Sequence, residues 1–99
     1  MKDVWIGQVG IWGQRHYQYL KENKPTILNI MRMNGTLKSY LRAIDKQAEE
    51  MIFQLVRQFA RQEGVTEELK RRDQMEWVRC MNSIRNRVEE IVKSELIFE

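Results

Sequence analysis

Two stretches of this chain carry apolar residues at the spacing of an amphipathic helix, and a glycine lies between them. In the first stretch the apolar positions are Leu37, Leu41, Ile44, Ala48, Met51, Leu55 and Phe59. In the second stretch they are Trp77, Met81, Ile84, Val88 and Ile91. Steps of three and four residues place such positions on one side of a helix. The pattern predicts an all-α fold in which two long helices, joined by a tight turn at Gly64, pack as an antiparallel hairpin.

Proline and glycine mark where the expected helices begin and end. Pro25 separates a short helix over residues 14–23 from a second short helix over residues 25–34, because proline suits the first turn of a helix. Gly35 and Gly64 fit helix ends in the left-handed conformation. We therefore expect two short N-terminal helices in front of the hairpin, in a bundle-like arrangement.

Three polar residues stand where helices should begin. Thr36 can cap the first long helix, and Thr66 can cap a short helix after the turn. Asp73, with Glu76 three residues further on, fits a capping box. The second long helix is therefore expected to start after a break near Asp73 and to run to about Ile97.

The beginning of the chain is apolar but lacks a helical period. We expect residues 1–13 to form an irregular N-terminal arm, or a short extended piece, that packs on the domain or on a neighbouring chain. The chain as a whole, residues 1–99, is expected to be a single helical domain. Residues 1–35 cannot cover a hairpin some 40 Å long. Part of the apolar stripe should then stay open, which favours a homodimer.

Composition excludes several classes of protein. The longest run of strongly apolar residues is Met51-Ile52-Phe53, far short of the roughly 20 that a membrane span needs, so no membrane partner is expected. The start of the chain shows no secretory signal, because glycines and Gln8 interrupt its apolar residues. A single cysteine excludes an internal disulfide. A cytoplasmic location is expected.

The residues that could carry catalysis are few and scattered. His16 is the single histidine and Cys80 the single cysteine, and they lie far apart in the sequence. We expect His16 to be a ring at the surface or at an interface and Cys80 to pack as a small hydrophobe. Neither a glycine-rich phosphate loop nor a Glu-x-x-His metal motif occurs. The sequence therefore predicts no enzyme, no metal and no cofactor.

The charge balance is mildly basic. The chain has 17 Lys and Arg against 14 Asp and Glu, a net charge of +3, and its pI is about 9.2. Residues 1–35 hold five bases and two acids, so by sequence the N-terminal third contains the excess. A pI above about 9 permits a nucleic-acid partner, although a modest excess is equally typical of an ordinary soluble surface.

A row of bases stands at the start of the first long helix. Lys38, Arg42 and Lys46 are four residues apart, so they share one side of that helix. A short helix, a tight turn and this helix together resemble a helix-turn-helix, in which the second helix enters the major groove of DNA. Thr36 and Ser39 would then join Lys38 and Arg42 in the contacting set.

The same charges also fit a solvated surface. Arg42 has Asp45 three residues on, and Lys46 has Glu50 four residues on, which favours ion pairs along the helix. Towards the end of the chain, similarly spaced pairs are Glu67–Arg71, Glu68–Arg72, Arg85–Glu89 and Glu89–Lys93. We interpret these C-terminal pairs as helix support rather than as a nucleic-acid face.

A second polar face lies further along the first long helix. It consists of Gln54, Arg57, Gln58, Arg61 and Gln62, with no acid before Glu63. Amides and guanidinium groups suit phosphate and base contacts, and they equally suit the polar rim of a protein interface. The residues predicted to contact phosphate are Lys38, Arg42, Lys46, Arg57 and Arg61, with Lys21 and Lys24 behind them.

Motifs over nearly the whole chain resemble one family. In the C-terminal part they are GVTEELK (64–70), DQMEWV (73–78), MNSIR (81–85), EEIV (89–92) and ELI (95–97). Upstream they are GIWG (10–13), YLKENKP (19–25), NGTL (34–37) and AID (43–45). Together these motifs resemble the transposon-encoded protein TnpV family.

The resemblance implies a cytoplasmic, non-catalytic bacterial protein carried on a mobile element of Clostridia and related Gram-positive bacteria. Its expected setting is near recombination or transfer genes, and DNA binding is presumed from that setting. The leading expectation is a small accessory protein that binds DNA or assists transposition or recombination. The alternative is a helical interaction and dimerisation module without DNA affinity, which docks a protein of the same mobile element.

Overall fold

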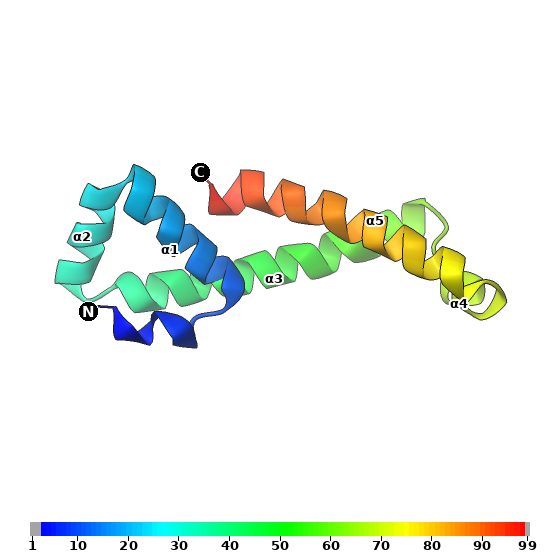
Figure 1. Ribbon diagram of the computed structural model, residues 1–99, viewed down its shortest axis with the longest axis horizontal. Helices are drawn as coiled ribbons and strands as arrows, with labels where there is room; N and C mark the ends of the chain where they lie inside the picture. Colours follow the sequence, from blue (N-terminus) through cyan, green and yellow to red (C-terminus); the bar gives the residue numbers. More distant parts are fainter. Residues whose placement is uncertain (1–2, 99) are drawn as a thin grey trace.

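The computed structural model describes residues 3–98, which form helices and connecting turns with no β-strand among them (Figure 1). The elements in chain order are η1 (Val4–Gln8), α1 (Ile11–Asn23), α2 (Pro25–Asn34), α3 (Leu37–Gln62), α4 (Glu67–Arg72), α5 (Gln74–Val92) and η2 (Lys93–Ile97). η1 is a short 3-10 helix, and η2 is a π-helical turn that continues α5. The predicted all-α, bundle-like class is confirmed.

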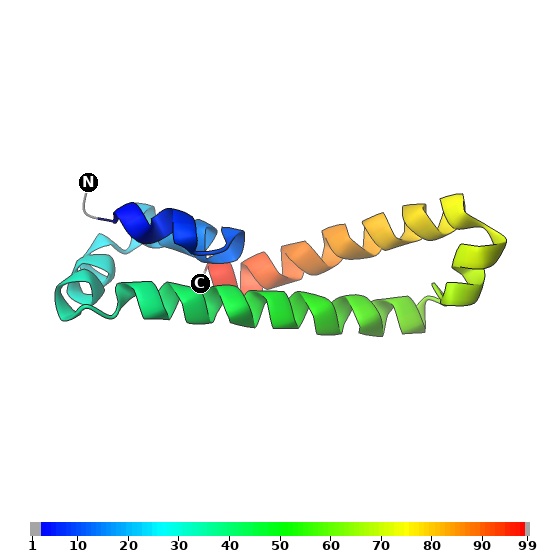
Figure 2. The same cartoon turned by 90° about the horizontal axis from the view of Figure 1, so that it is seen from below.

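The molecule is elongated, with extents of 55 × 22 × 17 Å. α3 runs along most of its length. α5 runs in the opposite direction, lies beside α3 near its own C-terminal end and separates from α3 towards α4 (Figures 1 and 2). α4 connects the two at one end of the molecule. At the other end α1, α2 and η1 surround the first half of α3, and η2 returns to them. One end therefore has several helices around α3, whereas the other has only α4 and α5.

Both glycines that were predicted to end helices adopt the left-handed conformation, with φ of 72° at Gly35 and 71° at Gly64. After each glycine a backbone N–H bonds back to the preceding helix, as the N–H of Val65 does to the Ala60 carbonyl at 2.8 Å. This arrangement satisfies carbonyl groups that the end of a helix leaves without partners. The local sequence thus determines where α2 and α3 end.

Two of the three predicted helix caps are confirmed. The Thr66 hydroxyl accepts a hydrogen bond from the Leu69 N–H at 3.2 Å, and the Asp73 carboxylate accepts one from the Glu76 N–H at 3.1 Å. The predicted break near Asp73 separates α4 from α5. Thr36 occupies the N-cap position of α3, but the predicted cap is wrong, because its side chain makes no capping hydrogen bond there. Its backbone, with φ −103° and ψ −4°, is not in the extended conformation typical of a capping residue.

The N-terminal segment is more regular than predicted. Residues 4–8 are helical, and α1 begins at Ile11 instead of Gln14. The Trp12 and Gly13 N–H groups at the start of α1 donate hydrogen bonds to Asp45 Oδ1 at 3.0 and 3.1 Å. A carboxylate on α3 therefore caps α1 across the interface between the two helices. Sequence spacing could not indicate this contact, since its partners lie more than thirty residues apart.

The same interface requires glycine at two positions of α1 and its lead. A Cβ at Gly10 would collide with the Asp45 carboxylate, and one at Gly13 would lie 2.8 Å from the Leu41 carbonyl oxygen. The absence of side chains therefore lets α1 approach the backbone of α3 closely. Of the three N-terminal glycines, Gly7, Gly10 and Gly13, the last two are thus explained by packing.

A buried carboxylate ties η1 to the domain. Asp3 is 5% exposed, forms an ion pair with Arg32 at 2.5 Å and accepts a hydrogen bond from the Tyr17 hydroxyl at 2.7 Å. Burial and the bond to Asp3 raise the pKa of Tyr17. The expectation that the segment packs on the domain is confirmed from Asp3 onward, while residues 1 and 2 lie outside the described part of the chain.

The buried apolar residues gather at the end of the molecule that contains α1. One cluster lies between α1, α2 and the start of α3, and it comprises Val9, Leu20, Leu28, Leu37 and Leu41. A second cluster joins α3 to α5 and η2, and its buried members are Trp12, Ile44, Ala48, Val65, Ile84, Val88, Val92 and Ile97. Within residues 53–87, which we call the distal arm, only Val65 and Ile84 are buried.

Candidate nucleic-acid interface

Four of the predicted phosphate contacts lie exposed along α3. Arg42, Lys46, Arg57 and Arg61 all have exposed side chains, and none forms an ion pair with any described residue. We call these four residues the basic ridge. They occupy the side of α3 away from its buried residues. At 1.5 Å per residue, the ridge extends about 28 Å from Arg42 to Arg61.

Lys38 is the predicted contact that the fold holds most firmly. Its side chain is partly buried, and its ammonium group donates a hydrogen bond to Gln8 Oε1 at 3.0 Å. The N-terminal segment therefore lies against the start of α3 (Figure 2). In the predicted helix-turn-helix this start would enter the major groove, so η1 would lie beside the DNA-contacting residues.

Lys21 and Lys24 lie apart from the ridge, at the end of α1 and in the turn to α2. Both side chains are exposed. The ammonium group of Lys24 is 5.9 Å from the centre of the Tyr19 ring. The structure therefore divides the predicted set between the length of α3 and the corner between α1 and α2.

The ion pairs predicted along α3 do not form. Asp45 was expected to pair with Arg42, but its carboxylate is directed towards the N-terminus of α1 instead. No ion pair joins Lys46 to Glu50 either. The interpretation of this row as a salt-bridged face is therefore wrong, and Asp45 caps α1 instead of pairing with Arg42.

The C-terminal pairs predicted from spacing are also wrong. Among the described residues Arg71, Arg72, Arg85 and Glu89 form no ion pair, and Lys93 contacts Glu90 at 3.4 Å rather than Glu89. Two further ion pairs in this part of the chain are Arg79–Glu76 at 2.5 Å and Arg87–Glu63 at 2.8 Å. The second of these joins α5 to the end of α3. Spacing missed it because it depends on how the two helices align.

Dividing the charges by structure gives a different result from dividing them by sequence. The distal arm holds eight Lys and Arg and five Asp and Glu, a net charge of +3. The remaining residues hold nine of each and are neutral overall. Two of the acids in the arm, Glu63 and Glu76, are already bonded to arginines, which lower the pKa of both carboxyl groups. The arm is thus the basic part of the molecule.

Two adjoining surfaces of the arm share Arg57. A groove of about 380 Å³ between α3, α5 and the start of α1 is lined by Trp12, Glu49, Ile52, Phe53, Val56, Arg57 and Arg85. A shallow depression on α3 is lined by Gln54, Arg57, Gln58 and Arg61. The Arg57 guanidinium lies 5.4 Å from the centre of the exposed Phe53 ring. Arg85, which sequence analysis assigned to an internal pair, therefore borders the same surface as Arg57.

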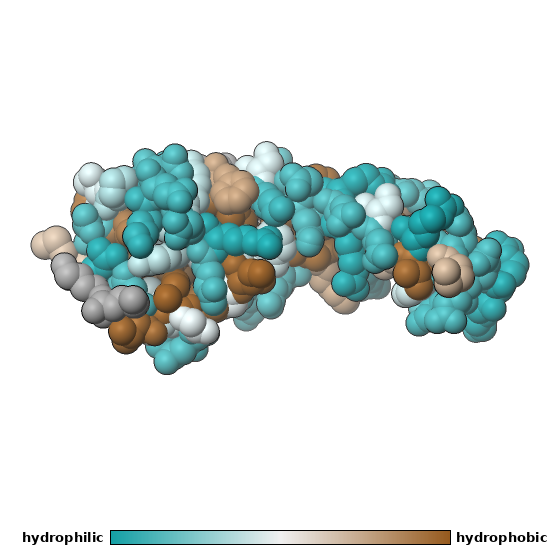
Figure 3. Space-filling model, in the orientation of Figure 1, coloured by the Kyte–Doolittle hydropathy of each residue, from teal (hydrophilic) through white to brown (hydrophobic). Residues whose placement is uncertain are grey.

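The space-filling view shows how polar and apolar side chains are distributed over one face of the molecule (Figure 3). The end of the molecule that contains α4 is largely hydrophilic on the face shown, with small apolar groups beside it (Figure 3). Apolar side chains gather at the opposite end, over η1, where Val4 is 75% exposed.

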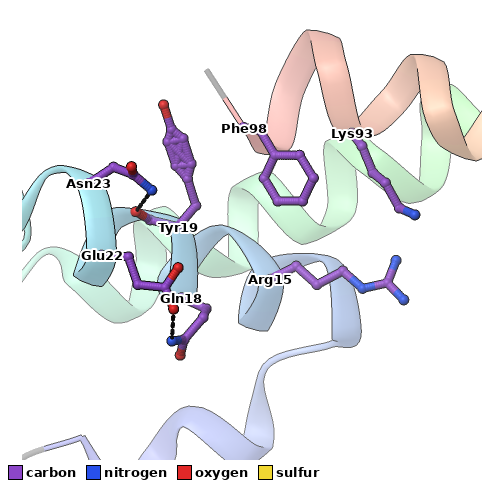
Figure 4. Close-up of a pocket in the computed structure, with 7 residues that line it drawn as sticks. All are labelled: Arg15, Gln18, Tyr19, Glu22, Asn23, Lys93 and Phe98. Carbon is purple, nitrogen blue, oxygen red and sulfur yellow. Dashed lines mark hydrogen bonds between the residues drawn. The ribbon is translucent and has the colours of Figure 1, made fainter.

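A separate groove of about 600 Å³ lies between α1 and the C-terminal end (Figure 4). The rings of Tyr19 and Phe98 stack there with their centres 5.9 Å apart. Its two cations, Arg15 and Lys93, already have partners, because Arg15 lies over the Trp12 ring at 4.7 Å and Lys93 contacts Glu90. Both basic side chains of this groove therefore already have partners.

His16 is buried, so its predicted place at the surface or at an interface is wrong. The ring is 3% exposed, and Nδ1 lies 2.7 Å from the Ile97 carbonyl oxygen. Because a carbonyl can only accept, Nδ1 carries the proton, and in the neutral ring Nε2 accepts from the Tyr40 hydroxyl at 2.8 Å. His16 thus joins α1 to η2 and α3.

Cys80 packs against the core of α3 and α5, as expected for a small hydrophobe. Burial, followed by the nearby Glu76 carboxylate, raises the pKa of its thiol. Among residues 3–98, no three His, Cys, Asp or Glu side chains are grouped closely enough to hold a metal ion. None of the described helices is both long and apolar enough to cross a membrane.

Comparison with known proteins identifies a family for the chain. A family model described as transposon-encoded protein TnpV matches residues 3–97. Neither the curated proteins nor the solved structures contain a significant match. The match covers the whole described structure except Phe98, including α3 and the distal arm. The chain therefore belongs to the family of transposon-encoded proteins TnpV.

Proposed function

We propose that the protein is a non-catalytic accessory of a bacterial mobile element that binds duplex DNA through α3. The observation that supports this most directly is the basic ridge, whose four side chains are exposed and lack ion pairs within the described chain. Family membership adds a setting in which DNA is the common substrate of the neighbouring machinery. This function requires a cytoplasmic location, where bacterial DNA lies.

The shape of α3 suits such a contact. It is one continuous helix, and its opposite side packs against α1 and α5. The ridge is therefore presented on a straight support rather than on a loop. Its length of about 28 Å corresponds to about eight base pairs at 3.4 Å each. Basic side chains along it would contact phosphates, which position a protein on DNA without reading the sequence.

Fluorescence anisotropy of a labelled 20-base-pair duplex tests the proposal. Four phosphate contacts predict a slope of log affinity against log salt of about −3.6, so affinity should fall about 100-fold between 50 and 200 mM salt. No binding at 50 mM salt, or binding that does not respond to salt, would contradict the proposed function.

A second candidate function is dimerisation without DNA binding. The observation that favours it is the partial exposure of the arm's apolar stripe, since Leu55, Phe59, Trp77 and Met81 are packed against the core but not buried. A second copy could cover this stripe by pairing two arms into a four-helix bundle.

Sedimentation equilibrium from 1 to 100 μM protein tests the dimer. A twofold mass that decreases when Leu55 and Met81 are both replaced by Ser would support it. A constant monomer mass across this range would exclude dimerisation as the function of the stripe.

A further inference from the structure

The whole net charge of the chain lies in the distal arm, residues 53–87. The helix-turn-helix interpretation instead predicts that DNA contacts the start of α3. The arm has a net charge of +3 and the rest of the chain a net charge of zero. Since phosphate binding follows local positive potential, the arm is the part of the surface best suited to DNA.

The acids of the arm form no ion pair with Arg57, Arg61 or Arg85 among the described residues. Glu63 is bound by both Nη atoms of Arg87 at 2.8 Å, and Glu76 is bound by Arg79. Asp73 caps the start of α5. Glu67 and Glu68 occupy the first turn of α4, where a negative charge suits the helix dipole, and neither pairs with a base within residues 3–98.

Three arginines from two helices form one connected surface. Arg85 on α5 and Arg57 on α3 line the same groove, and Arg57 and Arg61 line the adjoining depression. Gln54 and Gln58 lie in that depression and add amide donors. Glu49 is the carboxylate that lines the groove, while the depression has no acidic residue among those that line it.

The start of α3 is less suited to phosphate. Lys38 is partly buried and bonded to Gln8. Arg42 and Lys46 are exposed, but Glu49 and Glu50 follow them within two turns and are exposed as well. These neighbouring carboxylates offset the positive charge of Arg42 and Lys46. This half of the ridge is therefore nearly neutral and attracts a polyanion such as DNA less strongly.

We infer that the distal arm is the phosphate-binding surface, and that Arg57, Arg61 and Arg85 contact one face of a DNA duplex. The inference rests on the proposed function and narrows it, because it locates the contact and adds Arg85. A surface built from two helices presents its charges across a width as well as along a length. Arg57 and Arg61 would follow one strand along α3, while Arg85 reaches from α5.

Two triple variants with the same loss of charge test this location. In one, Arg57, Arg61 and Arg85 are replaced by Ala; in the control, Lys38, Arg42 and Lys46 are replaced by Ala. Anisotropy with the 20-base-pair duplex is measured from 50 to 200 mM salt. The arm variant should reduce the salt slope by about 2.7 and weaken binding at 100 mM more than tenfold. The control variant removes two side chains of the basic ridge, Arg42 and Lys46, and should reduce both the salt slope and the affinity at 100 mM less than the arm variant does.

Circular dichroism of both variants establishes that they fold, since the six side chains are at the surface or only partly buried. An Arg57→Lys, Arg61→Lys, Arg85→Lys variant should retain most of the binding, because phosphate attraction depends mainly on charge. Equal losses in the two Ala variants, or a larger loss in the control, would overturn the arm as the site and leave DNA binding intact.

Two other outcomes of these measurements would contradict DNA binding itself as well as its location. If the unchanged protein bound no duplex at 50 mM salt, both the proposed function and the location would be wrong. If it bound polyglutamate instead, and the arm variant abolished that binding, the partner of the arm would be an acidic protein rather than DNA.

Discussion

The two ends of α3 carry the same apolar pattern but bury it to different depths. At the end near α1, Leu41 and Ala48 are fully buried and Ile44 is 8% exposed. In the distal arm, Leu55 and Phe59 continue the same spacing yet remain partly exposed. The first half of α3 has α1, α2 and the C-terminal end around it, whereas the second half has only α4 and α5.

This difference shows what the apolar stripe encodes. Spacing determines which side of a helix faces its neighbours, but the number of neighbours determines how far that side is removed from water. A helix with a single long partner buries a narrow strip, and a helix with partners on two sides buries a wider one. The distal arm therefore keeps apolar side chains at its surface and gathers its charges around them.

The largest expected effect comes from the same substitution at the two ends. Leu41→Ala should reduce the free energy of unfolding by about 2–5 kcal/mol, because it leaves a cavity in a closed core. Leu55→Ala should reduce it by about 1–2 kcal/mol, since water already reaches that side chain. Urea denaturation of both variants measures the difference. Equal losses would mean that the arm is as well covered as the other end, as a dimer would require.

Next in size is the close contact between α1 and α3. Gly13→Ala should reduce the free energy of unfolding by about 1–3 kcal/mol, because the added methyl group meets the Leu41 carbonyl oxygen. The control is Gly7→Ala, where a Cβ meets nothing within 4 Å. Thermal denaturation compares the two. A harmless Gly13→Ala substitution would show that α1 can move away from α3 without loss.

The caps of the two ends provide a finer comparison. Asp45→Ala removes the acceptor of two N–H groups and should cost about 1–2 kcal/mol, whereas Asp73→Ala removes the acceptor of one and should cost about 0.5–1 kcal/mol. Asp45→Asn keeps an oxygen acceptor and serves as the control. Urea denaturation measures all three. A smaller loss at Asp45 than at Asp73 would show that the cross-helix cap adds little to the proximal end.

The smallest effect is a dependence on pH confined to the arm. Arg87 and Arg79 lower the pKa of Glu63 and Glu76 below the ordinary value of 4.5. Their contribution to stability is therefore complete above pH 4.5 and is lost as the pH falls through the lowered values. Hydrogen exchange of arm amides between pH 6 and pH 3 should show this loss.

Glu63→Gln is the matched variant for the pH measurement. It should weaken the contact between α3 and α5 at pH 6 and make exchange in the arm less dependent on pH. An unchanged pH dependence in this variant would assign the effect to other carboxyl groups.

Local features of the sequence were sufficient for most of the fold. The helix ends at Gly35 and Gly64 and the caps at Thr66 and Asp73 follow from residues within a few positions of one another. The candidate site was predicted less completely. Arg57 and Arg61 were identified from their shared face, but Arg85 was assigned to an internal pair, because spacing along one helix gives no information about the groove that it shares with Arg57.

The sequence by itself thus determined the helices, their ends and the side that each buries, since backbone conformation and apolar spacing act within a few residues. The tertiary structure alone decided that Asp45 caps α1 instead of pairing with Arg42, that His16 is buried, and that the positive charge lies in the distal arm. Each of these depends on how distant helices align. Coulomb forces and hydrogen bonds act between side chains that are close in space, whatever their separation in sequence.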